Sequence, residues 1–328
     1  MQQDNKQKTI NGVALFFLIC LVIRVLMMFC NSILDGKNII VPEELQLTMS
    51  ELIILVPTLI FALKKKSSFR EDLGFKKIKA GTIFMSVLLA ALISPAATLI
   101  NLISQLFVPN TLAQASEELL SGSIPIVVFI ASVYGPFCEE FCFRSAIMKY
   151  YEKGAGFIKA MLISSLFFGF MHLNVNQACY AFYLGIAFAI VNKASGSVYT
   201  SMIIHTCVNG ANMLIVVASY KAIKAMGYKT DVFAMAEKMR TSTSILYFYI
   251  GVFLVLSVIC IAIAVPCVIW IAKNEGQLEK LKDAFSRSKN KEVGKVRAFF
   301  NVPSVVATVL VLFLLFGLKP LLTLLGLS

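Results

Sequence analysis

The chain consists of long runs of apolar residues separated by short polar segments. The apolar residues cluster in these runs instead of recurring in a periodic pattern. Because a helix needs about 20 apolar residues to cross the hydrocarbon core of a bilayer, each run predicts a membrane span. The runs cover residues 9–30, 47–63, 81–108, 123–147, 157–172, 178–192, 198–218, 244–272 and 302–326.

The pattern predicts an all-α fold, a polytopic transmembrane helical bundle with about eight or nine spans, since the runs 157–172 and 178–192 are short. Composition agrees: 58% of the 328 residues are hydrophobic and 15% are charged, which is more apolar than a soluble domain. We divide the chain into an N-terminal transmembrane segment with a basic loop (1–121), a core of closely spaced runs (122–217), and C-terminal helices with a second basic loop (218–328).

The net charge of +12 is explained by membrane topology. If the N-terminus is cytoplasmic, most Lys and Arg residues lie on the cytoplasmic side, chiefly in Lys64–Lys79 and Lys273–Arg297, as the positive-inside rule requires. The segment Lys221–Arg240 is the exception. We therefore expect a multi-pass protein of the cell membrane that contacts anionic lipid headgroups, and no nucleic-acid partner.

Ionisable residues inside membrane spans are costly and mark functional sites by default. Arg24 lies among Val, Leu and Ile in the first run, where we expect it to face another helix without an assigned role. Glu139, Glu140 and Arg144 lie near the end of the run that starts at residue 123. Glu140 and Arg144 are four residues apart and can pair on one helix face. Glu139 is rotated about 100° away and lacks that partner.

Two interpretations of this acidic cluster are open from its own residues. Either it is a solvated group at a helix end, or Glu139 serves as a general base in apolar surroundings. The two histidines of the chain favour the second interpretation, because His172 and His205 both lie in apolar runs of the same core. Asn209 shares a helix face with His205. A base, imidazoles and an amide donor are what peptide-bond hydrolysis requires.

Motifs of the common serine and metalloprotease types are missing from the sequence: it has no GxSxG and no HExxH. The polar residues instead resemble the three motifs of the CPBP family. This family comprises type II CAAX-prenyl-endopeptidase-like and bacteriocin-processing membrane proteases and is also called the Abi family. The motifs stand in order on successive apolar segments as Glu139-Glu140-x-x-x-Arg144, Phe168-x-x-x-His172 and His205-x-x-x-Asn209.

The resemblance covers about residues 122–217 and implies a helical bundle with a cavity open toward one side of the membrane. It implies that Glu139 and His172 activate the attacking water, while His205 and Asn209 bind the oxyanion. Some relatives have a third acidic residue in the first motif, where this chain has Cys138.

The supporting residues follow from the same resemblance. Glu140 and Arg144 would hold the helix geometry, in agreement with their spacing, and Phe168 would pack against the site or line the cavity.

The need for a metal is open at this point. Glu139, His172 and His205 could supply three zinc ligands and leave a position for water. We favour a mechanism without a cofactor, because Asn209 is a poor zinc ligand and a good oxyanion donor.

The expected function is thus that of an intramembrane endopeptidase acting on a peptide or a membrane protein. Two alternatives use the same groups: a non-catalytic peptide-binding protein with an immunity or scaffolding role, and a transporter that relays protons through buried Glu and His. The transporter is disfavoured because the sequence has no internal repeat of the kind that transporters show. No sequence feature determines the oligomeric state.

Overall fold

The fold was analysed in a computed structural model, which describes residues 2–110, 120, 122–226, 243–286 and 300–317. Every regular element in these residues is a helix, so the predicted all-α class is confirmed. The end of the run 302–326 and parts of the segments Lys221–Arg240 and Lys273–Arg297 lie outside the described residues. The elements are α1 Gln2–Gly36, α2 Glu43–Lys64, α3 Ala80–Ser104, α6 Ile124–Phe129, η1 Ile130–Tyr134, α7 Gly135–Glu140, η2 Phe141–Met148, α8 Lys149–Ala155, α9 Phe157–Met171, α10 Val175–Ser195, α11 Val198–Ala225, α13 Thr243–Asn274, α14 Leu278–Phe285, α16 Val302–Leu312 and η3 Phe313–Gly317.

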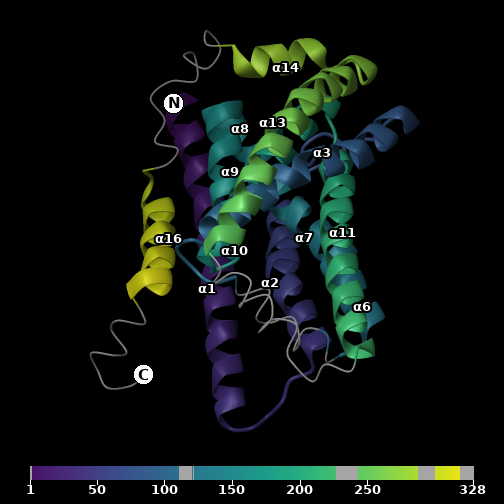
Figure 1. Ribbon diagram of the computed structural model, residues 1–328. Coiled ribbons are helices and arrows are strands. Elements are labelled where there is room, and N and C mark those ends of the chain that lie inside the picture. The colour runs from purple at the N-terminus through teal and green to yellow at the C-terminus, as the bar shows by residue number, and fades with distance from the viewer. Residues whose placement is uncertain (1, 111–119, 121, 227–242, 287–299, 318–328) are drawn as a thin grey trace.

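Within the described residues, seven helices are long and apolar enough to cross a membrane. Two shorter apolar helices, Phe157–Met171 and Val302–Gly317, accompany them. This agrees with the eight or nine spans predicted from the sequence, and the protein is a multi-pass membrane protein. Helix α13 lies on the outside of the bundle against α3 and α10 (Figure 1). Most of its large apolar side chains are exposed, as a surface in contact with lipid allows.

The span that carries the acidic cluster is longer than its apolar run. A continuous helical segment extends from Ile124 to Ala155, through two π-helical stretches, η1 and η2. It ends where Gly156 takes a φ of +79°, a conformation that glycine adopts at little cost. Glu139 therefore lies near the middle of the span and not near its end, which corrects the sequence-based placement. The sequence pattern misplaced the end because the polar residues from Lys149 onward remain helical.

The centre of the bundle is formed by α9 and α10 together with η2 and α1. Phe17 of α1 stacks on Phe167 of α9 with ring centroids 3.9 Å apart. Gly169 of α9 faces the backbone of α10, and a methyl group at this position would lie 2.9 Å from the carbonyl oxygen of Ala178. Small residues at such contacts let helix backbones approach closely in a membrane.

Replacing this glycine tests the close approach of α9 and α10. We expect Gly169→Ala to destabilise the fold by about 1–3 kcal/mol, because the added methyl group has to push against backbone. The measurement is the midpoint of thermal unfolding in detergent. Gly251→Ala is the matched control, since Gly251 lies in helix α13 and a methyl group there meets nothing within 4 Å. Equal midpoints for the two variants would contradict the packing described.

Candidate active site

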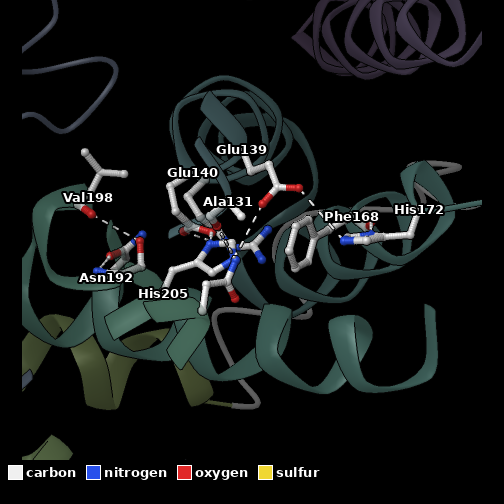
Figure 2. A network of polar contacts seen from close by, with 11 residues as sticks. Ala131, Glu139, Glu140, Phe168, His172, Asn192, Val198 and His205 are labelled. Carbon is white, nitrogen blue, oxygen red and sulfur yellow. Dashed lines mark hydrogen bonds and ion pairs between the residues drawn. The ribbon is translucent and has the colours of Figure 1, made fainter. Parts of the chain in front are cut away.

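The candidate residues come from three separate helical elements that meet inside the bundle. Glu139 and Glu140 end α7, His172 follows the last residue of α9, and His205 and Asn209 lie one turn apart on α11. Figure 2 shows the side chain of Glu139 directed toward both imidazole rings. The structure thus brings together residues that are up to 70 positions apart in the sequence.

Local sequence explains how His172 is presented. Helix α9 ends at Met171, and Leu173 takes a positive φ of 52° that turns the chain. Asn174 then caps α10 by accepting a hydrogen bond from the backbone N–H of Gln177, a common N-cap arrangement. The imidazole of His172 therefore stands at a helix end, where its ring is free to face α7.

Glu140 and Arg144 form an ion pair that is fully buried. The Nε of Arg144 lies 3.6 Å from Oε2 of Glu140, and neither side chain is exposed. This confirms the pairing predicted from their i, i+4 spacing. The guanidinium also lies over the rings of Phe168 and Phe188, at 5.0 and 5.8 Å from their centroids. Such contacts stabilise a cation where its nitrogens lack water.

His205 connects this ion pair to the neighbouring carboxylate. Its Nδ1 lies 3.2 Å from Oε1 of Glu140, and its Nε2 lies 3.5 Å from Oε2 of Glu139. Its ring packs on Phe188 with centroids 4.8 Å apart. The carboxylate of Glu140 is held from both sides, by Arg144 and by His205, so its position is strongly constrained.

Glu139 is held less tightly and is more accessible. Its Oε1 lies 3.9 Å from Nε2 of His172. The exposed fraction is 16% for the side chain of Glu139 and 15% for that of His172. His205, by comparison, is only 3% exposed. The pair of Glu139 and His172 is therefore the more exposed part of the cluster.

Hydrogen bonding determines the tautomer of His172. Its Nδ1 lies 2.8 Å from the carbonyl oxygen of Phe168. Because a carbonyl only accepts, Nδ1 carries the proton, and Nε2 of the neutral ring offers a lone pair toward Glu139. A separation of 3.9 Å between Nε2 and Oε1 allows one water molecule to bond both atoms from the side.

Asn209 lies one turn from His205 on α11, and its hydrogen bond in the described residues is made to backbone. Its Nδ2 donates a hydrogen bond of 3.2 Å to the carbonyl oxygen of Ala131 in η1. The four residues that the sequence analysis assigned to catalysis therefore lie in one part of the bundle. The oxyanion role that the resemblance implies for His205 and Asn209 stays a prediction.

The zinc alternative was tested against this arrangement. The Nδ1 bonds of both histidines are of the kind that metal-binding histidines also make. However, no group of three or more His, Cys, Asp or Glu side chains in the described part of the chain forms a metal site. Glu139, His172 and His205 are therefore not identified as a metal site, the choice between a metal-free and a zinc mechanism stays a prediction, and we derive no step through a metal.

Sequence reasoning overlooked Glu51, which lies in the apolar run 47–63. The same argument that singled out Glu139 applies to it, because it is a carboxylate inside a predicted span. In the structure, Oε2 of Glu51 is buried without a hydrogen-bond partner in the described residues. Glu51 also interacts electrostatically with Glu139 and Arg24.

Comparison with known proteins finds matches to the segment that carries these residues. Residues 121–211 match the family model of type II CAAX prenyl endopeptidase Rce1-like proteins. The chain is 25% identical over 182 residues to the membrane-embedded CAAX protease MroQ of Staphylococcus aureus (strain USA300), covering 53% of this chain and 74% of MroQ.

A second relative matches over a shorter alignment. Over 87 residues the chain is 26% identical to YdiL of Bacillus subtilis (strain 168), which carries the name of a membrane peptidase. That alignment covers 26% of this chain and only about a third of YdiL, 36%. No solved structure matches the chain. The matched segment contains every motif residue of the site, from Glu139 to Asn209. Residues 121–211, which carry the whole candidate site, are therefore similar to the Rce1-like type II CAAX prenyl endopeptidase domain.

Proposed function

We propose that the protein is an intramembrane endopeptidase in which Glu139 is the general base. One observation carries the proposal: the accessible carboxylate of Glu139 lies in mid-span against the Nε2 atoms of both His172 and His205. A carboxylate on the protein surface is solvated by water and does not need contacts with two imidazoles. A carboxylate and an imidazole lone pair that face one water molecule are suited to remove its proton.

The proposed reaction has two steps. Glu139 and His172 bind a water molecule, and Glu139 takes its proton as the water oxygen bonds to the carbonyl carbon of the peptide. The C–N bond then breaks, and the proton passes from Glu139 to the leaving amine. The products are a carboxylic acid and an amine, so all atoms of the peptide and the water are accounted for.

The negative charge on the tetrahedral intermediate requires nearby donors. We assign this role to Asn209 and to His205. When Nδ1–H of His205 donates to Glu140, its Nε2 donates to the intermediate only if that nitrogen also carries a proton. Glu140 and Arg144 act by holding this histidine in place.

The substrate we propose is a peptide or a membrane-associated protein that is cut near one end. The similarity to a CAAX protease supports a substrate of this kind. Since the site lies inside the bundle, the scissile bond has to enter the bundle to reach Glu139. We further propose that the N-terminus is cytoplasmic, on the basis of the charge distribution.

Removing the base tests the proposal directly. We expect Glu139→Gln to reduce cleavage of a quenched-fluorescent peptide library in detergent by at least about 10²-fold, because the amide cannot accept a proton. Glu279→Gln, on the exposed surface of α14, is the matched control and should cleave like the wild type. If Glu139→Gln also kept the cellular function of the protein, a non-catalytic peptide-binding role would replace the peptidase proposal.

A chelator distinguishes the two chemical mechanisms. We expect cleavage by the purified wild type to be unchanged by a strong chelator, and elemental analysis to find less than one zinc per chain. The reason is that the proposed mechanism uses the carboxylate of Glu139 as the base, and that no group of three or more possible ligands is found in the described residues. Cleavage that is lost with chelator and restored by zinc would contradict the metal-free mechanism.

Measurements of stability can separate the structural role of Glu140 from the proposed catalytic role of Glu139. We expect Glu140→Gln to destabilise the protein by about 3–5 kcal/mol, because it leaves the charge of Arg144 buried without compensation. Glu139→Gln should unfold near the wild-type temperature. Glu140→Leu combined with Arg144→Met removes both charges and should recover part of the stability that Glu140→Gln loses. Thermal midpoints in detergent give the comparison, and equal midpoints for the two single glutamine variants would refute the structural role.

A further inference from the structure

Arg24 continues the buried stripe of helix α1. The buried positions of this helix recur with the spacing of one helix face, and Arg24 is the next position of that spacing. It therefore points into the bundle, as its partial burial also indicates. The buried members of the stripe are Ile10, Val13, Ala14, Phe17, Cys20 and Leu21.

Contacts along α1 set its register against the other helices. At one end, a methyl group on Gly154 would lie 2.9 Å from Ile10. Seven residues further along α1, Phe17 stacks on Phe167 and lies 6.4 Å from Phe143, measured between ring centroids. The N-terminal part of α1 thus lies beside α8, and the helix then passes η2 and α9 (Figure 1).

This register brings Arg24 to the depth of the active site. Arg24 lies seven residues beyond Phe17, about 10 Å at the helical rise of about 1.5 Å per residue. The helix that carries Glu139 runs opposite to α1, so Glu139, four residues before Phe143, is displaced in the same direction as Arg24. His172 comes five residues after Phe167. Arg24 also interacts electrostatically with both Glu139 and His172.

The guanidinium of Arg24 makes no hydrogen bond or ion pair with any residue that the structure describes. Its Nε is buried without a partner. An arginine inside a membrane protein is costly unless its charge is compensated. The rigid fork of a guanidinium matches a carboxylate in a bidentate pair.

Glu51 supplies the compensating charge at longer range. It precedes Ile54, Thr58 and Ala62 on the buried face of α2. Its Oε1 lies 3.4 Å from the position of a methyl group on Gly135, which is one turn before Glu139 on the same helix face. Arg24 and Glu51 thus border the site from two helices that lie outside the family match at residues 121–211.

We propose that Arg24 forms a substrate subsite that binds a carboxylate of the peptide being cleaved. The proposal rests on the proposed peptidase function and specifies the substrate it takes. A peptide carries a carboxylate either at its C-terminus or on Asp and Glu side chains, and both present the same two oxygens to the guanidinium. A guanidinium without a hydrogen-bond partner in the described residues, at the depth of the general base, anchors such a group while the scissile bond lies at Glu139.

The test separates binding from cleavage. Purified wild-type protein, Arg24→Gln, Arg24→Lys and Lys8→Gln are immobilised in detergent and exposed to random peptide libraries with apolar C-terminal residues. One library ends in a free carboxylate, the second ends in an amide, and the third has a free carboxylate but Asn and Gln in place of Asp and Glu. Mass spectrometry measures both the peptides retained and the peptides cut. Lys8→Gln is the matched control, because it removes one positive charge from the exposed part of the same helix.

We expect wild type and Lys8→Gln to retain the free-acid library over the amide library by about tenfold or more, the value of a hydrogen-bonded charge pair. Arg24→Gln should lose this preference, and Arg24→Lys should keep part of it. If the preference follows the side-chain carboxylates instead, the third library loses it, and the subsite binds an acidic side chain.

Two results would overturn the subsite: equal retention of acid and amide libraries by the wild type, or an undiminished preference in Arg24→Gln. A carboxylate preference in the wild type that Arg24→Gln loses, without any cleavage, would support the subsite and count against the peptidase function. The two proposals can therefore fail separately.

Discussion

The buried ion pair between Glu140 and Arg144 is the interaction on which the rest of the site depends. Neither side chain is exposed, and the pair lies inside a membrane span. Two charges in such surroundings are tolerated only when each is compensated. The rings of Phe168 and Phe188 and the imidazole of His205 complete that compensation. The requirement ties η2, α9, α10 and α11 to one another, and it orients the histidine that faces Glu139.

Adjacent glutamates acquire different surroundings because a helix rotates its side chains by about 100° per residue. Glu140 is directed into the packed core, where Arg144 and His205 hold it. Glu139 is directed toward His172 and stays partly accessible. One carboxylate is thus structural and the next is available for chemistry, although they are identical in type and neighbours in sequence. The π-helical stretch η2, which carries Arg144, follows directly after them, and such stretches are frequent at functional sites.

The family match at residues 121–211 covers the candidate catalytic residues but not the whole surroundings of the site. Helices α1 and α2 precede residues 121–211 and pack against the helices of that segment. They carry Arg24 and Glu51, both of which interact electrostatically with Glu139. In a membrane, where apolar contacts distinguish helix partners poorly, charges of this kind restrict how the helices pack.

The sequence by itself determined the helical class, the apolar segments and the order of the motif residues. These features depend on local properties: the apolar length of a run and the spacing of residues along one helix, which also predicted the pair of Glu140 and Arg144. Tertiary structure alone decided that Glu139 lies in mid-span between His172 and His205, that His205 bonds Glu140, and that Arg24 and Glu51 border the site. Those contacts depend on how far each helix is rotated and shifted against its neighbours. Packing between helices decides rotation and depth, because a bilayer offers the same apolar surroundings to every face of a span.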